Sequence, residues 1–374
     1  MPSPCAILFQ PDRLVNPARG ARTMPLLESR GIRHYTAPTM RQLPSTLSDR
    51  FGRRIDYVRL SITDRCDFRC VYCMAEEMTF VPKREVLSLE ELYQVARAFT
   101  ELGVSKIRLT GGEPLIRTDM LSLVQRLGQL PGLDQLALTT NGSQLQRMAG
   151  ELRGAGVKRV NISLDSLRPR RFRQLTRHGC LEQVIAGIDA AIAAGFQEVR
   201  INAVILKGRN DDEVLDLVDF ACRRGIDIAF IEEMPLGRIV EHDRALSLAS
   251  SAELRASIGQ RYQLAPLGDP AGNAGPARYY SLSGQRSRVG FISPHSSNFC
   301  HLCNRVRVTV EGRLLLCLGN EHSADLRAVL RHPRHTLTDL KREIVAAMAI
   351  KPERHHFDLA GEPEIVRFMN TTGG

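Results

Sequence analysis

The sequence predicts an α/β fold, a partial (β/α)6 barrel of the TIM type with a further region on its C-terminal side. Short β-branched runs recur roughly every 30 residues from residue 55 onward, amphipathic stretches separate them, and six such units are present. Repeated strand–helix units form a parallel sheet with right-handed crossovers, and a closed barrel needs eight of them. We therefore expect an open barrel with a gap on one side.

The expected strands are short and apolar. They comprise residues 56–62, 105–109, 134–139, 158–164, 198–205 and 226–231. Helices are expected between them, most clearly over 89–99 and 181–192, where apolar residues recur with the helical period. Ser88 and Glu91 form a capping-box pattern before the first of these helices. Residues 210–213, Asn-Asp-Asp-Glu, are expected to cap the next helix at the surface rather than to bind a metal.

All six expected strands carry polar or glycine-rich segments at or near their ends. They are the loop that contains Cys66, then Gly111–Pro114, Thr139–Gly142, Asn161–Ser166, Arg200–Val204 and Glu232–Pro235. Each alone could be a turn or a helix cap. In α/β barrels, however, the chemistry lies at the carboxyl ends of the strands. We therefore expect these segments to form one shared site.

A group of three cysteines follows the first expected strand. Cys66, Cys70 and Cys73 have the spacing C-x₃-C-x₂-C, and no histidine occurs between His34 and His178. Structural zinc needs four protein ligands, whereas a [4Fe–4S] cluster held by three thiolates keeps one iron open for a ligand. The ligand count favours such a cluster, with zinc or three unrelated buried cysteines as the alternatives.

A second cysteine group lies near the C-terminal end. Cys300, Cys303 and Cys317 have the spacing C-x₂-C-x₁₃-C, with a hairpin turn expected at residues 311–312. Zinc is as good an interpretation here as a cluster, because C-x₂-C pairs are common in zinc sites. The possible fourth zinc ligands are His295, His301 and His322.

Two arginines follow this second C-x₂-C pair. On a strand, Arg305 and Arg307 would point to the same face as Cys303. Guanidinium groups match phosphate geometry, so the pair suits a triphosphate. A solvated sheet edge is the alternative.

The charge balance indicates an anionic partner. The chain of 374 residues has 51 Lys and Arg against 41 Asp and Glu, a formal net charge of +10. This excess suits a nucleotide, a phosphate or a nucleic acid. The chain has no tryptophan and few aromatic residues, which argues against a platform on which bases stack. We expect no nucleic-acid partner.

The sequence also predicts a cytoplasmic protein with no membrane contact. It contains no apolar run of about 18 residues and no signal-peptide pattern. Six of its nine cysteines fall into the two groups described above, as metal ligands do in a reducing compartment.

Three parts are expected along the chain. Residues 1–45, rich in Pro, Arg and Ser, are expected to form a disordered N-terminal extension, with a start at Met40 or a nucleic-acid-binding arm as alternatives. Residues 46–240 are expected to form the barrel. Residues 241–374 contain the second cysteine group and a terminal Gly-Gly.

The motifs together resemble a known family. The first cysteine group and Gly111-Gly-Glu-Pro114 resemble the radical S-adenosylmethionine (SAM) superfamily. Together with the C-terminal C-x₂-C-x-R-x-R…C pattern and the terminal Gly-Gly, they resemble the GTP 3′,8-cyclases of molybdenum-cofactor biosynthesis, the MoaA family. The resemblance extends from about residue 50 to Gly374.

The resemblance implies two [4Fe–4S] clusters, one on each cysteine triad, with SAM on the first and GTP at the second. The residues implied for SAM are Tyr72, Gly112, Ser163 and Met234. Those implied for GTP are Arg59, Arg108, Thr139, Arg200, Arg305 and Arg307. Gly373 and Gly374 would insert toward the active site. No catalytic side chain beyond these cluster and substrate ligands is implied.

The implied reaction converts GTP to 3′,8-cyclo-7,8-dihydroguanosine 5′-triphosphate, and the enzyme would be a lyase. The implied partners are a downstream MoaC-type cyclic pyranopterin monophosphate synthase, a reductant such as flavodoxin or ferredoxin, and a second copy of the chain in a homodimer. The alternatives are another radical SAM enzyme with an auxiliary cluster, such as a peptide-modifying maturase, and a zinc protein that binds nucleic acid.

Two positions depart from the family pattern. Arg200 stands where members usually carry lysine, and Ala229 stands where arginine commonly precedes Phe-Ile-Glu. Arg200 keeps the charge but changes its reach. If the missing arginine normally holds substrate or SAM, that contact must come from elsewhere in this chain.

Overall fold

The computed structural model describes residues 43–239, 243–268, 275–355, 357 and 365–373. The strands of these residues form one twelve-stranded sheet in the order β12-β11-β10-β1-β2-β3-β4-β5-β6-β9-β8-β7. Their bounds are β1 Tyr57–Ser61, β2 Lys106–Thr110, β3 Gln135–Thr140, β4 Val157–Ser163, β5 Glu198–Val204, β6 Asp227–Ile231, β7 Leu264–Pro266, β8 Arg278–Leu282, β9 Arg288–Ile292, β10 Arg305–Val308, β11 Arg313–Leu315 and β12 Ser323–Asp325.

The centre of the sheet is parallel and open. The six expected strands are confirmed as β1 to β6, each within two residues of its expected bounds. The region after residue 240 adds one parallel strand to each side, since β9 pairs with β6 and β10 pairs with β1. Beyond each added strand the sheet continues with antiparallel strands, so it does not close on itself. The open barrel is therefore confirmed, whereas the parallel pairing of β9 with β6 and of β10 with β1 was not predicted.

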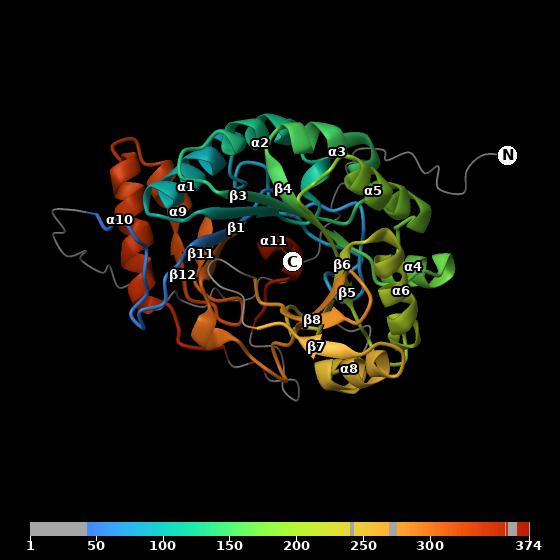
Figure 1. Ribbon diagram of the computed structural model, residues 1–374. Helices are drawn as coiled ribbons and strands as arrows, with labels where there is room; N and C mark the ends of the chain where they lie inside the picture. The colour runs from blue at the N-terminus through green and yellow to red at the C-terminus, as the bar shows by residue number, and fades with distance from the viewer. Residues whose placement is uncertain (1–42, 240–242, 269–274, 356, 358–364, 374) are drawn as a thin grey trace, which may run out of the picture. The chain divides into compact units, whose positions relative to one another are not determined.

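Helices cover the outer face of this sheet, as Figure 1 shows for α1 to α6. The α-helices are α1 Leu89–Glu101, α2 Met120–Gly128, α3 Leu145–Gly154, α4 Pro169–Thr176, α5 Leu181–Ala193, α6 Val214–Arg224, α7 Arg244–Ser247, α8 Ser251–Gly259, α9 Leu326–Leu330, α10 Leu337–Ala347 and α11 Met369–Thr372. Short 3₁₀ helices are η1 Pro114–Ile116, η2 Asp211–Glu213, η3 Cys300–Leu302 and η4 Met348–Ile350. The capping box of α1 is confirmed, because Ser88 accepts a hydrogen bond from the Glu91 N–H and Glu91 accepts one from the Ser88 N–H.

Alternation along the strands separates the core from the interior of the barrel. Leu60, Ile107 and Ile162 point outward and are completely buried under the helices, and each contributes about 1.5–3 kcal/mol of hydrophobic stabilisation. Their neighbours point into the barrel and are largely polar, for example Arg59 and Arg108. Buried parallel strands are usually apolar on both faces, so this polar interior indicates a binding site.

The segment 210–213 differs from its prediction. Asn210 makes no capping hydrogen bond and is completely buried. Its side chain accepts a hydrogen bond from the Leu206 N–H (2.7 Å) and donates to the carbonyls of Asp165 (2.8 Å) and Val204 (2.9 Å). The expectation of an exposed cap is therefore wrong. Asn210 instead fixes the chain beyond β5 to the end of β4.

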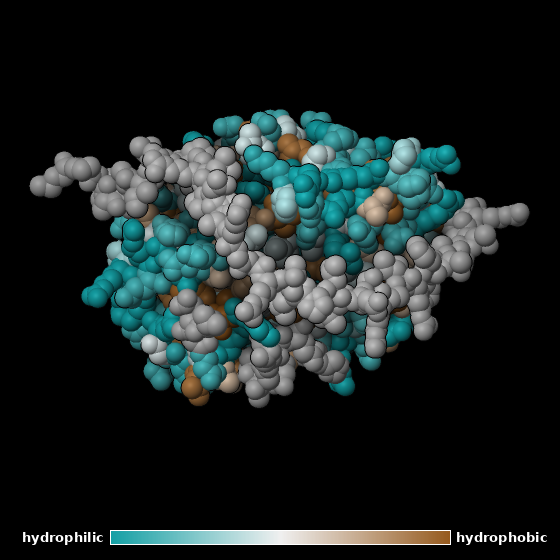
Figure 2. Space-filling view, turned by 180° about the vertical axis from the view of Figure 1, so that it is seen from behind, coloured by the Kyte–Doolittle hydropathy of each residue, from teal (hydrophilic) through white to brown (hydrophobic). Residues whose placement is uncertain are grey.

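The last described residues lie inside the curve of the sheet, where Figure 1 shows α11. The hairpin expected at residues 311–312 is confirmed between β10 and β11, and Gly312 adopts a positive φ of 83° there. Seen from behind, the surface formed by the described residues is mainly hydrophilic, with small hydrophobic areas (Figure 2). In the part of the chain that the structure describes, no helix has the length and apolar character needed to span a membrane.

Candidate active site

A cavity inside the barrel is lined by both cysteine groups. The first triad, Cys66, Cys70 and Cys73, follows the carboxyl end of β1. The second triad, Cys300, Cys303 and Cys317, lies near the opposite end, because Arg305 at the start of β10 pairs with Tyr57 at the start of β1. Residues 293–304 connect β9 to β10 and so bring Cys300 and Cys303 to the open side of the barrel. The shared site expected from the strand ends is therefore present, with a second triad at its other end.

The loop of the first triad is held by the segment that follows β3. Asn141 donates to the carboxylate of Asp67 at 2.6 Å, and its amide nitrogen lies 3.8 Å from Cys66 Sγ. Glu113 in turn accepts hydrogen bonds from the Thr140 hydroxyl (2.8 Å) and the Asn141 N–H (2.6 Å). Burial and then the charge of Asp67 raise the pKa of Glu113 to about 8. The acid of the Gly-Gly-Glu-Pro motif thus connects two loops of the site.

The glycines of the same motif permit close backbone approach. A Cβ on Gly112 would lie 2.2 Å from the Arg65 carbonyl oxygen, and one on Gly111 would lie 2.3 Å from that of Thr63. No side chain fits at either position without moving the cysteine loop. The motif therefore sets the distance between the Cys66 loop and β2.

The three thiols of the first triad suit a cationic group. Burial, followed by neighbouring anionic groups such as Asp67 and Asp165, raises the pKa of Cys66 and Cys70 well above its ordinary value and that of Cys73 to about 12. Three such thiols deprotonate together only if a strong positive charge binds them. Among the residues that the structure describes, no fourth side chain joins the three sulfur donors, and such a set fits a [4Fe–4S] cluster with one open iron.

The second triad has basic neighbours. Burial would raise the pKa of Cys303, but the charges of Lys351 and Arg305 outweigh it and lower that pKa. Burial raises the pKa of Cys300 and Cys317. This set of three sulfurs also fits a cluster, here with positive charge close to one of its ligands.

The histidines proposed for a zinc site at the second triad do not assemble there. His295 directs Nε2 to the Glu233 carbonyl oxygen at 2.8 Å, and His301 and His322 are exposed. Among the described residues, no three His, Cys, Asp or Glu side chains converge as ligands of a single ion do. A [4Fe–4S] cluster does not require this convergence, because each thiolate binds a different iron.

Sequence reasoning missed two residues beside the second triad. The nitrogen Nδ1 of His355 lies 3.0 Å from Cys300 Sγ, and the Lys351 ammonium lies 3.7 Å from Cys303 Sγ. Both belong to the segment Lys351-Pro-Glu-Arg-His355. Nothing in the local pattern separates this segment from an ordinary helix end, so only its position after folding reveals it.

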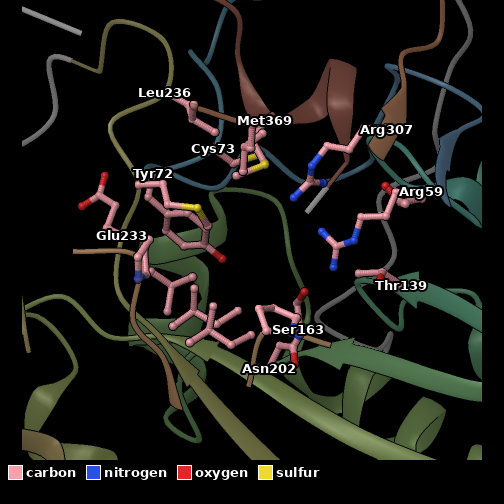
Figure 3. Close-up of a pocket in the computed structure, with 18 of the residues that line it drawn as sticks. Arg59, Tyr72, Cys73, Thr139, Ser163, Asn202, Glu233, Leu236, Arg307 and Met369 are labelled. Atoms are coloured by element: carbon pink, nitrogen blue, oxygen red, sulfur yellow. The ribbon is translucent and has the colours of Figure 1, made fainter. Parts of the chain in front are cut away.

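Five arginines from β10, β1, β2 and β5 converge on the interior of the barrel. Arg307, Arg59 and Arg108 lie in register across β10, β1 and β2, and Figure 3 shows Arg59 and Arg307 directing their guanidinium groups into the cavity near Thr139. Arg305 and Arg200 complete the set, which we call the arginine cluster. Among the described residues, none of the five forms an ion pair with a carboxylate.

The arginine cluster surrounds the phenol of Tyr57. Arg59 and Arg108 donate to the Tyr57 hydroxyl oxygen at 3.1 and 2.8 Å. Burial raises the pKa of Tyr57, but the charges of Arg108, Arg59 and Lys106 outweigh burial and lower it well below its ordinary value. Burial and mutual repulsion also lower the pKa of Arg307. Buried guanidinium groups with so little negative charge between them favour an anionic ligand such as a phosphate chain.

The structure brings most of the predicted site residues to this cavity. Those that line it are Tyr72, Gly112, Ser163 and Met234 from the SAM set, and Arg59, Thr139, Arg305 and Arg307 from the GTP set. Arg108 and Arg200 lie behind the lining instead. Arg108 donates to the lining residue Thr139 at 3.3 Å, and Arg200 donates to the lining residue Asn202 at 3.1 Å.

The C-terminal tail reaches the same cavity. Arg307 donates to the Gly373 carbonyl at 2.6 Å, and Asn370 donates to the Asp64 carbonyl at 3.0 Å. Gly373 has a φ of 72°, and a Cβ there would lie 1.3 Å from the Thr110 hydroxyl oxygen. A glycine is thus required where the tail passes β2. The insertion predicted for Gly373 agrees with this position, whereas Gly374 lies outside the described residues.

The departure at Ala229 is accompanied by a tyrosine from β8. Asn202, Ala229, Gly290 and Tyr279 lie in one row across β5, β6, β9 and β8. The ring of Tyr279 would be 3.0 Å from a Cβ on Gly290, so the ring covers this position. Its hydroxyl oxygen accepts a hydrogen bond from Arg200. The two small residues therefore leave room for Tyr279 to reach Arg200.

Comparison with protein families finds two matches. Residues 60–221 match the Radical SAM superfamily, and residues 226–357 match the family Molybdenum Cofactor Synthesis C. Among solved structures, SuiB from Streptococcus suis is similar, with a TM-score of 0.57 at 14% sequence identity over 81% of this chain and 68% of that chain. This structural similarity concerns the fold, and together with the superfamily match it confirms the predicted partial barrel of the radical SAM type.

Curated relatives are similar over most of the chain. A protein from Marinobacter nauticus named GTP 3′,8-cyclase is 60% identical over 335 residues, which are 89% of this chain and 100% of that protein. A protein of the same name from Pseudomonas entomophila is 60% identical over 336 residues, which are 90% of this chain and 100% of that protein.

Proposed function

Because this chain belongs to the GTP 3′,8-cyclase family of radical SAM proteins, we propose that it converts GTP to 3′,8-cyclo-7,8-dihydroguanosine 5′-triphosphate, the first step of molybdenum-cofactor biosynthesis. The observation that carries this proposal is the arginine cluster between two cysteine triads. A substrate with three phosphates supplies the negative charge that these guanidinium groups lack. Its base and ribose then lie between the two triads.

The first triad would hold a [4Fe–4S] cluster whose open iron binds SAM. When bound, the two groups supply the radical that removes hydrogen from the substrate. Tyr72, Gly112, Ser163 and Met234 would contact SAM. The Tyr72 hydroxyl donates to Asp165 at 2.7 Å and is thereby held in place. Gly112 lets the backbone of Arg65 approach closely beside the cavity, because a Cβ there would lie 2.2 Å from the Arg65 carbonyl oxygen.

The second triad would hold a second [4Fe–4S] cluster near the guanine base. Arg59, Arg305 and Arg307 would bind the phosphates directly, and Thr139 would contact GTP beside them. Arg108 and Arg200 lie behind the cavity lining, and their side chains would move toward the phosphates when GTP binds. Orientation between two fixed sites and exclusion of water are the contributions of the protein.

The remaining proposals follow from the family. The product would pass to a MoaC-type synthase, and the electrons would come from flavodoxin or ferredoxin. We place the enzyme in the cytoplasm as a homodimer. Residues 46–240 would form the barrel, residues 241–374 the region of the second cluster, and residues 1–45 an extension.

Metal content tests the two-cluster proposal. Protein purified without oxygen is expected to contain about eight irons per chain, four for each cluster, and to cleave SAM faster when GTP is added. A triple alanine variant at Cys300, Cys303 and Cys317 should retain about four irons. If the protein contains zinc in place of iron, the proposed radical SAM activity is rejected and a zinc protein is favoured. If the rate of SAM cleavage does not change when GTP is added, another radical SAM activity is favoured.

Tyr279→Phe tests whether Tyr279 positions Arg200 for GTP. The variant removes one hydrogen bond from the guanidinium and keeps the ring. A hydrogen bond to a charged group is worth about 1.5–3 kcal/mol, so the Kd for GTP should rise roughly ten- to a hundredfold. Anaerobic calorimetry measures this change. Tyr280→Phe is the matched control, because the Tyr280 hydroxyl contacts Arg255 (3.3 Å) and not Arg200. Equal GTP affinity in Tyr279→Phe and Tyr280→Phe would contradict the role of Tyr279 in positioning Arg200.

A further inference from the structure

Lys351 is a buried cation beside the second triad. The exposed fraction of Lys351 is 1%. Its ammonium donates to the carbonyls of Leu316 (2.5 Å) and Arg305 (3.2 Å), and its third contact is the sulfur of Cys303 at 3.7 Å. An ammonium has three N–H donors, so these three partners use its whole capacity. In the described part of the chain, Lys351 forms no ion pair with a carboxylate.

This arrangement leaves a buried charge without a conventional counter-ion. A lysine is almost never completely buried unless it is paired, because desolvation of an unpaired charge costs several kcal/mol. A surface lysine can pack its aliphatic stem against the protein while its ammonium stays in water. The ammonium of Lys351 is buried with the rest of the side chain. The two carbonyls are neutral. Of the three partners, only the sulfur of Cys303 can carry negative charge.

The segment that contains Lys351 is held against the triad. Arg53 donates to the carbonyls of Cys300 (2.8 Å), Pro352 (2.7 Å) and Glu353 (2.6 Å). Arg53 also forms a 2.6 Å ion pair with Asp49, which is buried. The Arg53 guanidinium thus joins the cysteine loop to the residues next to Lys351. The distance between the ammonium and Cys303 is fixed by this clamp and by the two carbonyls.

We propose that Lys351 is a positioning residue for the second cluster and that its ammonium, directed at the Cys303 sulfur, stabilises the reduced form of that cluster. The inference rests on the proposed function, which places a [4Fe–4S] cluster on this triad. Reduction adds one electron to the cluster, forms or breaks no bond and moves no proton. Hydrogen bonds to the sulfurs and nearby charge are established determinants of cluster potential.

The sign of the effect follows from Coulomb's law. A fixed positive charge close to the cluster lowers the energy of the more negative, reduced form more than that of the oxidised form. Removing the charge should therefore shift the midpoint potential to more negative values. A purely structural lysine predicts a different result, since a neutral hydrogen-bonding side chain would then leave the potential unchanged.

The test isolates the second cluster in the full chain. Alanine at Cys66, Cys70 and Cys73 removes the first triad, and the protein is reconstituted with iron and sulfide under anaerobic conditions. Dithionite titration followed by electron paramagnetic resonance then gives the midpoint potential of the second cluster alone. In this background, Lys351→Met and Lys351→Gln are expected to shift it negatively, and Lys351→Arg is expected to stay closer to the parent. Lys341→Met is the control, because Lys341 on α10 pairs with Glu101.

Each outcome decides a different question. Zinc or no iron in the parent background would overturn the two-cluster proposal and this inference with it. Four irons in the parent and unchanged potentials in Lys351→Met and Lys351→Gln would overturn this inference alone. If both neutral variants fail to hold iron while Lys351→Arg holds it, the requirement for charge is supported. If all three variants lose iron, shape rather than charge is required, and the inference fails.

Discussion

Replacement of Cys66 with alanine is expected to abolish SAM cleavage. The first triad supplies three sulfur donors, so losing one leaves two thiolates for a cluster that needs three. Without the cluster, no electron reaches SAM. The measurement is the amount of 5′-deoxyadenosine formed under anaerobic conditions with dithionite, separated by chromatography.

Cys222→Ala is the matched control for this variant. Cys222 lies on α6 and is absent from the cavity lining, so its removal should leave SAM cleavage at the level of the unmodified protein. Cys66→Ala should also lose about four irons per chain, the content of one cluster. Full cleavage by Cys66→Ala would show that the first triad is not the ligand set.

Arg307→Ala and Arg305→Ala are each expected to weaken GTP binding by a factor of ten or more. Hydrogen bonds to a charged group contribute about 1.5–3 kcal/mol, and each 1.4 kcal/mol is a factor of ten in Kd. SAM cleavage without GTP should be intact, because neither arginine belongs to the first triad. Anaerobic equilibrium binding of GTP measures the first effect, and 5′-deoxyadenosine formation measures the second.

The two variants also separate two roles of the arginine cluster. Arg307 holds the carbonyl of Gly373, so its loss affects the C-terminal tail as well as the phosphates, whereas Arg305→Ala leaves this tail contact in place. Arg313→Ala is the control, since Arg313 lies on the same hairpin, is exposed and bonds Ser323. Unchanged GTP affinity in both Arg305→Ala and Arg307→Ala would reject the assignment of the arginine cluster to the phosphates.

Much of the fold and the site follows from short-range patterns. The periodicity of apolar residues depends only on neighbours within a strand or helix, and it placed β1 to β6 within two residues of their observed bounds. The spacing of Cys66, Cys70 and Cys73 defines a triad for the same reason, because one loop contains all three. Family resemblance added residues from separate strands, and eight of the ten named for SAM and GTP line the cavity.

Other features depend on contacts between distant segments. β9 and β10 join opposite sides of the parallel sheet, although they follow each other in sequence. The Asn-Asp-Asp-Glu segment has the composition of an exposed cap, yet Asn210 is buried and bonds the backbone of Val204 and Leu206 and that of Asp165 after β4. Composition does not reveal burial of this kind.

By itself, the sequence determined the six strand–helix units, the two sulfur triads and the Arg305 and Arg307 pair, because the residues of each lie close together in the chain. Only the tertiary structure decided which groups these residues meet: Tyr57 among the arginines, Tyr279 on Arg200, and Lys351 on Cys303. Register across a sheet and the packing of a C-terminal segment set those distances. Neither is encoded in any local stretch of sequence.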